Sequence, residues 1–289
     1  MRRLFCFGLG YSARALVRGL DRETWQIAGT ARDRERAAAA LPGVALHRFD
    51  GGRPLADVAA TFGGATHILV SIPPDPDDPV LRWHHADLQR LKALRWLGYL
   101  SATSVYGDCG GAMVDEQAPV RPSGERGRRR AEAEAAWLGL QQAHGLPVHV
   151  FRLAGIYGPE RSVLERLAAG TARRIVKPGQ VFSRIHVDDI ARTLAASIAR
   201  PRPGAIYNVA DDEPAPPQDV LAFGAALLGL PVPPEEPYQR ANLGPLAASF
   251  FQDHRRIDNR LLKQELGVVL RYPNFRLGLA AIGGTVTPA

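Results

Sequence analysis

The chain has 289 residues, of which 46% are hydrophobic, and a formal net charge of +7. This length fits one large α/β domain, alone or with a smaller lobe, and the apolar fraction suffices for a full core. No apolar run could span a bilayer, and two cysteines form neither a disulfide framework nor a metal set. The arginine-rich run at 126–130 lacks interleaved aromatic residues. We therefore expect a cytoplasmic protein without a membrane, nucleic-acid or metal partner.

A glycine motif opens the chain. The apolar run 3–7 leads into Gly8-Leu9-Gly10-Tyr11-Ser12-Ala13, and a helical pattern follows at 14–20. Strand, glycine turn and helix in this order are typical of dinucleotide-binding units. Gly8 permits the tight turn, Gly10 lets a pyrophosphate approach the backbone, and Ala13 lets the helix pack closely. The helix N-terminus offers free N–H groups, so we predict that all six residues form a cofactor site. The alternative is an ordinary glycine-rich turn.

Strands and helices alternate after this motif. The predicted strands are 25–30, 44–49, 67–72, 97–101 and 148–153, and the predicted helices are 34–41, 80–94, 125–144 and 190–199. This alternation requires parallel crossovers and predicts a Rossmann-type, doubly wound parallel sheet. Beyond Arg200, proline-rich turns predict a smaller, loop-rich C-terminal substrate lobe. We assign 1–160 to a dinucleotide-binding domain and 161–289 to a mixed segment that completes the sheet and forms the lobe.

Further motifs follow in order along the chain. They are Ser104-Val105-Tyr106-Gly107-Asp108, Arg152 with Ile156-Tyr157-Gly158-Pro159, Phe182-Ser183-Arg184-Ile185-His186-Val187-Asp188-Asp189 and Tyr207-Asn208-Val209. With them the chain resembles an extended short-chain dehydrogenase/reductase of the epimerase/dehydratase type, in an atypical subgroup. The resemblance implies a nicotinamide cofactor and a small-molecule substrate that binds between the sheet and the lobe. The sequence does not identify this substrate. A homodimer is left open.

The end of the second predicted strand indicates which dinucleotide binds. NAD-binding units place an acidic residue there to hold the ribose 2′-hydroxyl. This chain has Thr30-Ala31-Arg32-Asp33 instead. The Arg32 guanidinium suits a 2′-phosphate and Thr30 adds a hydroxyl, which favours NADP. Asp33 keeps NAD open, and Arg32 has the alternative of being an ordinary surface arginine.

The resemblance adds contacts beyond the glycine motif. Asp50, after the third strand, matches a residue that contacts the adenine amino group. Ser71, Ile72 and Pro73, after the fourth strand, match residues that pass beneath the cofactor.

The resemblance also shows departures at the reacting end. The family uses a Tyr-x-x-x-Lys pair on the long helix and a Ser or Thr at the end of the fifth strand. These positions match Arg126, Arg130 and Ala102, so all three are replaced. Arg130 still suits the nicotinamide ribose, but its guanidinium cannot shuttle a proton.

Three hydroxyls are candidates for the missing catalytic group. Tyr106 belongs to a motif that ends at the cleft, although the same motif has a structural role in the family. A shift of one position would bring Ser101 or Thr103 into the place of Ala102.

These residues support two functions. The first is an NADP(H)-preferring oxidoreductase or epimerase-like enzyme with a rearranged catalytic set, which we favour. The alternative is a non-catalytic NAD(P)-binding sensor or regulatory protein. In both cases we expect little turnover of hydroxysteroids, sugar nucleotides or simple carbonyl compounds.

Overall fold

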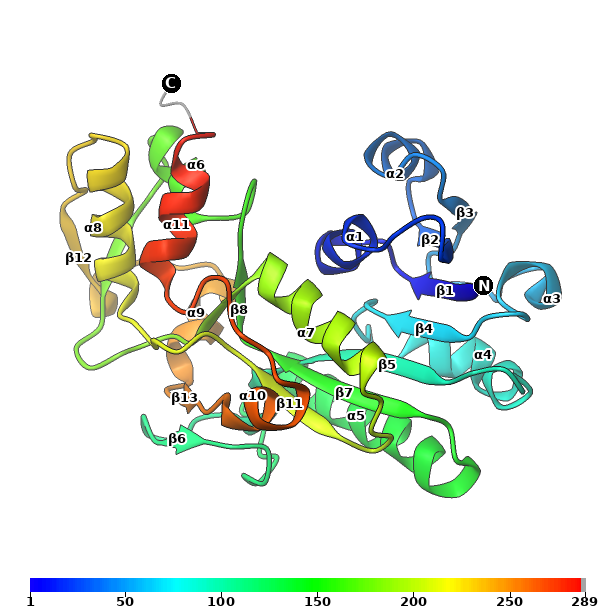
Figure 1. Ribbon diagram of the computed structural model, residues 1–289. Helices are drawn as coiled ribbons and strands as arrows, with labels where there is room; N and C mark the ends of the chain where they lie inside the picture. Colours follow the sequence, from blue (N-terminus) through cyan, green and yellow to red (C-terminus); the bar gives the residue numbers. More distant parts are fainter. Residues whose placement is uncertain (287–289) are drawn as a thin grey trace.

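The computed structural model describes residues 1–286, with the side chains of all of them except Arg36 and Leu246. A seven-stranded parallel sheet lies at its centre (Figure 1). Its strands are β1 (Arg2–Phe7), β2 (Trp25–Ala31), β3 (Ala45–Arg48), β4 (His67–Val70), β5 (Trp96–Ala102), β7 (Val148–Leu153) and β11 (Ile206–Val209). They are ordered β11-β7-β5-β4-β1-β2-β3, and all neighbouring pairs are parallel. This confirms the predicted Rossmann-type sheet.

Helices cover both faces of the sheet. They are α1 (Tyr11–Arg18), α2 (Arg34–Ala40), α3 (Val58–Thr61), α4 (Pro79–Gln89), α5 (Glu125–His144), α7 (Val187–Ala199) and α10 (Arg260–Leu266). The central strands read as continuous apolar runs, because helices bury them on both sides; β4 is His-Ile-Leu-Val, buried throughout. The strand order reverses between β1 and β4, and this switch point places a crevice at the carboxyl ends of both strands.

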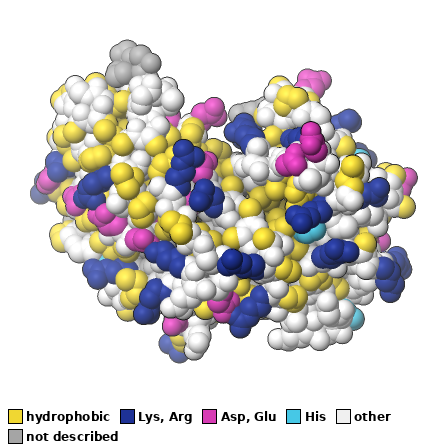
Figure 2. Space-filling view, viewed as in Figure 1, with side chains coloured by type: hydrophobic (Ala, Val, Ile, Leu, Met, Phe, Trp, Pro, Cys, Tyr) yellow, Lys and Arg dark blue, Asp and Glu magenta, His cyan; other side chains and the backbone are white. Residues whose placement is uncertain are grey.

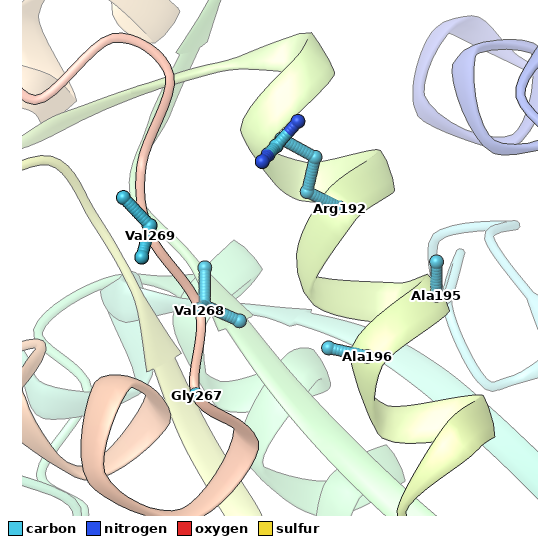
Figure 3. Close-up of a pocket in the computed structure, with 6 residues that line it drawn as sticks. All are labelled: Arg192, Ala195, Ala196, Gly267, Val268 and Val269. Carbon is cyan, nitrogen blue, oxygen red and sulfur yellow. The ribbon is translucent and has the colours of Figure 1, made fainter.

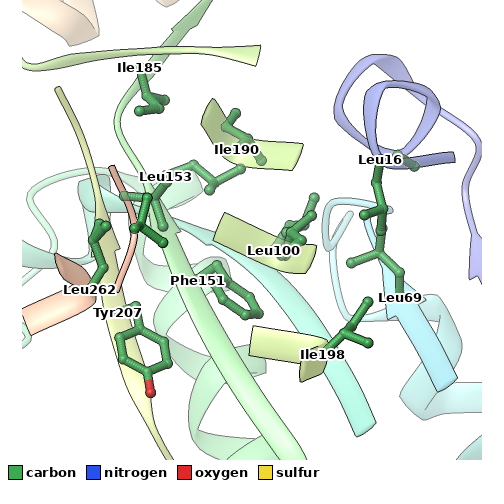
Figure 4. Packing of buried hydrophobic residues seen from close by; sticks show 14 of the residues in the cluster. Leu16, Leu69, Leu100, Phe151, Leu153, Ile185, Ile190, Ile198, Tyr207 and Leu262 are labelled. Atoms are coloured by element: carbon green, nitrogen blue, oxygen red, sulfur yellow. The ribbon is translucent and has the colours of Figure 1, made fainter. Parts of the chain in front are cut away.

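One core cluster lies between the sheet and α1 and α7 (Figure 4). Leu100 and Phe151 project from β5 and β7 towards Ile190 of α7, and Leu16 of α1 packs near Leu69 of β4. A second cluster on the opposite face contains Trp137 of α5. Because both clusters extend across several strands, the carboxyl edge of the sheet is a rigid platform for the loops that follow it.

A C-terminal lobe lies beside this edge (Figure 1). Its core joins α6 (Val163–Ala168), α8 (Pro217–Leu227) and α11 (Phe275–Gly283). The proline-rich segments at 201–204 and 231–234 are irregular, as predicted, whereas the one at 212–217 ends in Pro217, which opens α8. Pro245 likewise opens α9 (Pro245–Gln252). Proline suits this first position, where its missing N–H has no intrahelical partner anyway. The lobe is therefore more helical than the sequence indicated.

Three short strand pairs lie outside the central sheet. They are β8 (Gly155–Tyr157) with β10 (Arg184–His186), β9 (Arg174–Val176) with β12 (Glu235–Pro237), and β6 (Met113–Val114) with β13 (Arg256–Ile257). Two 3-10 turns are η1 (Thr103–Tyr106) and η2 (Tyr238–Arg240). The segment 161–289 contributes β11 and α7 to the sheet domain as well as most of the lobe. Over residues 1–286, no helix has the length and apolarity that crossing a membrane requires.

Candidate functional site

The glycine loop between β1 and α1 is fixed from both sides. Gly8 has a φ of +89°, and its N–H donates to the Thr30 hydroxyl at 2.8 Å. The Ser71 hydroxyl donates to the Gly8 carbonyl at 2.5 Å. A β-carbon on Gly8 would lie 2.8 Å from Cγ1 of Ile72. The turn therefore requires glycine for its backbone angle and for space.

Gly10 has different surroundings. It is the exposed N-cap residue of α1, and an ideal β-carbon on it would meet no described atom within 4 Å. No side chain caps α1, and its first turn holds no acidic residue, whereas Asp78 caps α4 by accepting from two backbone amides. Open space thus lies beside Gly10, at an N-terminus of α1 that no side chain caps. This arrangement fits the phosphates of a dinucleotide.

The other motif residues shape this opening from behind. Leu9 and Ser12 are buried, each 7% exposed, and Ala13 is fully buried against the core. Tyr11 is half-buried; its hydroxyl donates to the Pro159 carbonyl at 2.7 Å, and burial raises its pKa to about 12.

The end of β2 holds two of the predicted cofactor contacts. Thr30 is fully buried, and its hydroxyl accepts the Gly8 amide, so its side chain holds the glycine loop. Arg32 lies just beyond β2, is exposed, and forms no ion pair within the described part of the chain. Its guanidinium is free to bind an anion.

The remaining predicted cofactor contacts that follow strands lie just beyond β3 and β4. Asp50 is exposed and accepts the Gly52 amide at 3.0 Å, which lowers the pKa of its carboxyl. Ser71 and Ile72 are partly buried, and Pro73 is exposed. The residues predicted to contact the cofactor thus lie at one edge of the sheet, on neighbouring strands.

A buried polar network occupies the ends of β5 and β7. The Ser101 hydroxyl donates to Glu134 of α5 at 2.9 Å, and Glu134 forms an ion pair with Arg152. Arg152 donates to the Tyr106 hydroxyl at 2.8 Å, which in turn donates to Oδ1 of Asn208 at 2.7 Å. Buried polar groups require such partners, and this network supplies them.

The network bears on two of the catalytic candidates. Ser101 and Tyr106 are only 2% and 1% exposed, and both hydroxyls are already hydrogen-bonded within the scaffold. Burial raises the pKa of Tyr106 to about 12, so its proton is not mobile near neutral pH. The geometry therefore favours the structural alternative for both residues.

Thr103 differs from them. It is 8% exposed at the start of η1, and its hydroxyl makes no hydrogen bond to any residue described. It directly follows Ala102 at the carboxyl end of β5. Nearby, Arg130 of α5 is partly buried and donates to the Leu100 carbonyl.

The sequence did not show that Glu134, Arg152 and Asn208 would converge. Arg152 and Asn208 stood in recognisable motifs, but their role depends on contacts between strands and a helix far apart in the chain. The only signal was the presence of charged or polar residues in otherwise apolar segments, since such residues are rarely buried without a partner.

The surface around the candidate site is notched between the lobe and the part of the molecule that carries α1 and α2, and arginine or lysine side chains line this notch (Figure 2). A separate pocket of about 250 Å³ lies between α7 and residues 267–269 (Figure 3). It is lined by Arg192, Ala195, Ala196, Gly267, Val268 and Val269, none of which is a predicted site residue. Among residues 1–286, no group of three or more His, Cys, Asp or Glu side chains is arranged to hold a metal.

The sheet order and the glycine loop after β1 define a Rossmann-type fold. The model of the NAD dependent epimerase/dehydratase family matches residues 80–210 of the chain. The chain is similar to protein YeeZ of Escherichia coli K12, with 28% identity over 95% of this chain and 97% of that protein.

Two solved structures share its fold. A conserved protein of unknown function from Silicibacter pomeroyi has 48% sequence identity and a TM-score of 0.89 over 99% of both chains. The dTDP-glucose 4,6-dehydratase of Bacillus anthracis, solved in complex with NAD, has 17% identity and a TM-score of 0.80 over 98% of this chain and 96% of that one.

Proposed function

We propose that this protein binds NADP(H) and acts as an oxidoreductase or epimerase-like enzyme. The observation that carries cofactor binding is Gly10, where open space lies beside an uncapped helix N-terminus at the switch point of the sheet. Gly8, Leu9, Tyr11, Ser12 and Ala13 shape this place. The NAD-bound relative from Bacillus anthracis supports a nicotinamide dinucleotide as the ligand.

Arg32 supports NADP over NAD. A 2′-phosphate beside Arg32 would receive charge-assisted hydrogen bonds that a 2′-hydroxyl cannot match. We expect Arg32→Ala to raise the Kd for NADPH by about 10- to 100-fold and to leave the Kd for NADH within about twofold.

Fluorescence titration with both reduced cofactors measures this preference. Arg18→Ala is the control, because Arg18 is an exposed arginine at the opposite end of α1. An equal loss for NADPH and NADH, or no loss, would contradict the proposed role of Arg32. Tight binding of NADH alone would identify NAD as the cofactor.

For the reaction, the cofactor would supply hydride transfer, and the chain would hold and orient the substrate. Thr103 is the candidate hydroxyl that is not committed to the buried network, and we assign it the orientation of a substrate oxygen. Arg130 would contact the nicotinamide ribose as a fixed cation. Asp50, Ser71, Ile72 and Pro73 would line the cofactor from the ends of β3 and β4.

A non-catalytic sensor is the second candidate function. It is favoured by the burial of Ser101 and Tyr106, which leaves no phenol with a mobile proton among the predicted catalytic residues. A screen of carbonyl compounds and nucleotide sugars with NADPH separates the two. Turnover that Thr103→Ala abolishes supports the enzyme. Tight NADPH binding without turnover, together with turnover in the variant Ala102→Ser/Arg126→Tyr/Arg130→Lys, supports the sensor.

A further inference from the structure

One stripe of α5 faces the sheet along the length of the helix. Arg130, Ala133, Glu134 and Trp137 follow helical spacing; Ala133, Glu134 and Trp137 are buried, and Arg130 donates to the Leu100 carbonyl of β5. Arg126 lies one turn before Arg130 on the same stripe. It is exposed, so the stripe continues beyond the packed part of the helix.

This first turn of α5 lies at the cofactor edge of the sheet. Because α5 connects β5 to the parallel strand β7, its N-terminus must lie near the carboxyl ends of the strands. A close contact between α5 and η1 supports this position, since an ideal β-carbon on Gly127 would lie 2.7 Å from the Ser104 carbonyl oxygen. Arg126 therefore stands beside the segment that begins with Thr103.

The charge of Arg126 is not balanced by its neighbours. Arg128 and Arg129 both form ion pairs with Glu125, the only acidic residue in the first turn. Arg126 forms no ion pair with any residue in the described part of the chain. A cation in the first turn of a helix is unfavourable by about 0.3–1 kcal/mol, and an anion bound beside it would offset this cost.

A second polar group lies under the same stripe. The Tyr99 hydroxyl is fully buried and has no hydrogen-bond partner within residues 1–286. Burial raises its pKa, and the nearby Arg130 guanidinium opposes this effect. The Tyr99 ring stacks on Trp137, and its hydroxyl lies near Arg130, in the packed part of the stripe.

From this arrangement we propose that Arg126 binds an anionic group of the substrate, a carboxylate or a phosphate, next to the reacting end of the cofactor. The inference rests on the proposed function, since it places this group beside a bound dinucleotide. The planar guanidinium donates two parallel hydrogen bonds to either anion. Arg126 stays protonated, so it is a binding residue and takes no part in proton transfer.

The test uses malonate and inorganic phosphate as probes, titrated calorimetrically into the full-length protein with and without saturating NADPH. Malonamide, which has the same skeleton without charge, controls for shape. We expect malonate or phosphate to bind the wild type, and Arg126→Gln to weaken that binding at least about tenfold. Arg126→Lys should recover part of the affinity, because it restores the charge without the fork.

Arg128→Gln is the matched control, because Arg128 is an exposed arginine of the same turn that already pairs with Glu125. The inference is overturned if the wild type binds neither anion, if malonamide binds as well as malonate, or if Arg128→Gln weakens binding as much as Arg126→Gln. The better-bound anion identifies the substrate group. The Kd for NADPH is measured in parallel: failure to bind NADPH refutes the proposed function, whereas NADPH binding without anion binding refutes only the role of Arg126.

Discussion

Replacement of Gly10 by valine separates cofactor binding from folding. In the structure, φ at Gly10 is −78° and ψ is −168°, which valine adopts without strain. An ideal β-carbon there would meet nothing within 4 Å. The only expected penalty is the weaker N-cap preference of valine, about 1 kcal/mol.

From these values we estimate the change in Tm and the change in the Kd for NADPH. Unfolding entropy for a chain of this length is about 0.6 kcal/mol/K, so the loss of about 1 kcal/mol should lower Tm by only about 2 °C. The branched side chain would, however, fill the space through which a pyrophosphate reaches the amides of α1. We expect the Kd for NADPH to rise at least about 100-fold, equivalent to about 2.7 kcal/mol.

The assay combines thermal unfolding monitored by circular dichroism with NADPH fluorescence titration. Gly8→Ala is the contrasting variant, because its positive φ and its 2.8 Å approach to Ile72 predict a larger loss of stability. If Gly10→Val bound NADPH as tightly as the wild type, the glycine motif would be an ordinary turn and our assignment of the site would fail. A fall in Tm well beyond a few degrees would show that the space beside Gly10 is not open.

Two further predictions concern buried polar groups. Tyr106→Phe removes the hydrogen bonds to Arg152 and Asn208, so we expect the free energy of unfolding, measured in urea, to fall by about 2–4 kcal/mol. The Kd for NADPH should stay within about twofold. An unchanged free energy of unfolding would contradict the structural role of Tyr106. Burial raises the pKa of Asp211 from 3.8 to about 8. Between these pH values the unfolded chain releases this proton while the folded chain keeps it, so wild-type stability should fall as pH rises from about 4 to about 8. Asp211→Asn should remove this fall and have the higher Tm at pH 8, whereas a lower Tm than wild type at pH 8 would refute the assignment.

The sequence predicted an element correctly where all the residues that define it adjoin in the chain. The helix predicted at 125–144 begins and ends as observed, because Gly124 and Gly145 bound a run rich in Ala, Arg, Glu and Leu that also tolerates Gly127 and Gly139. The glycine loop was equally readable, since strand, turn and helix adjoin in sequence. Proline did not distinguish a loop from the start of a helix, because it interrupts a helix from within but is favoured at the first helical position, as in α8.

Side-chain direction could not be predicted in the same way. Thr30 and Arg32 stand two positions apart at the end of β2, yet one is buried under the glycine loop and the other is exposed. Ser101 and Tyr106 both looked available for chemistry until α5 and β7 brought Glu134 and Arg152 against them. Such partners are separated by up to dozens of residues, and only tertiary packing brings them together.

The buried network also constrains how the strands align. Arg152 of β7 lies level with Ser101 of β5 on one side and with Asn208 of β11 on the other. A slip of β7 by one residue would turn Arg152 to the opposite face of the sheet and leave Glu134 buried without its cation. An uncompensated buried charge costs about 3–5 kcal/mol, so the slipped register is strongly disfavoured. The ion pair thereby acts against misaligned sheets during folding, and it does so at the three strand ends beside which the proposed substrate site must be built.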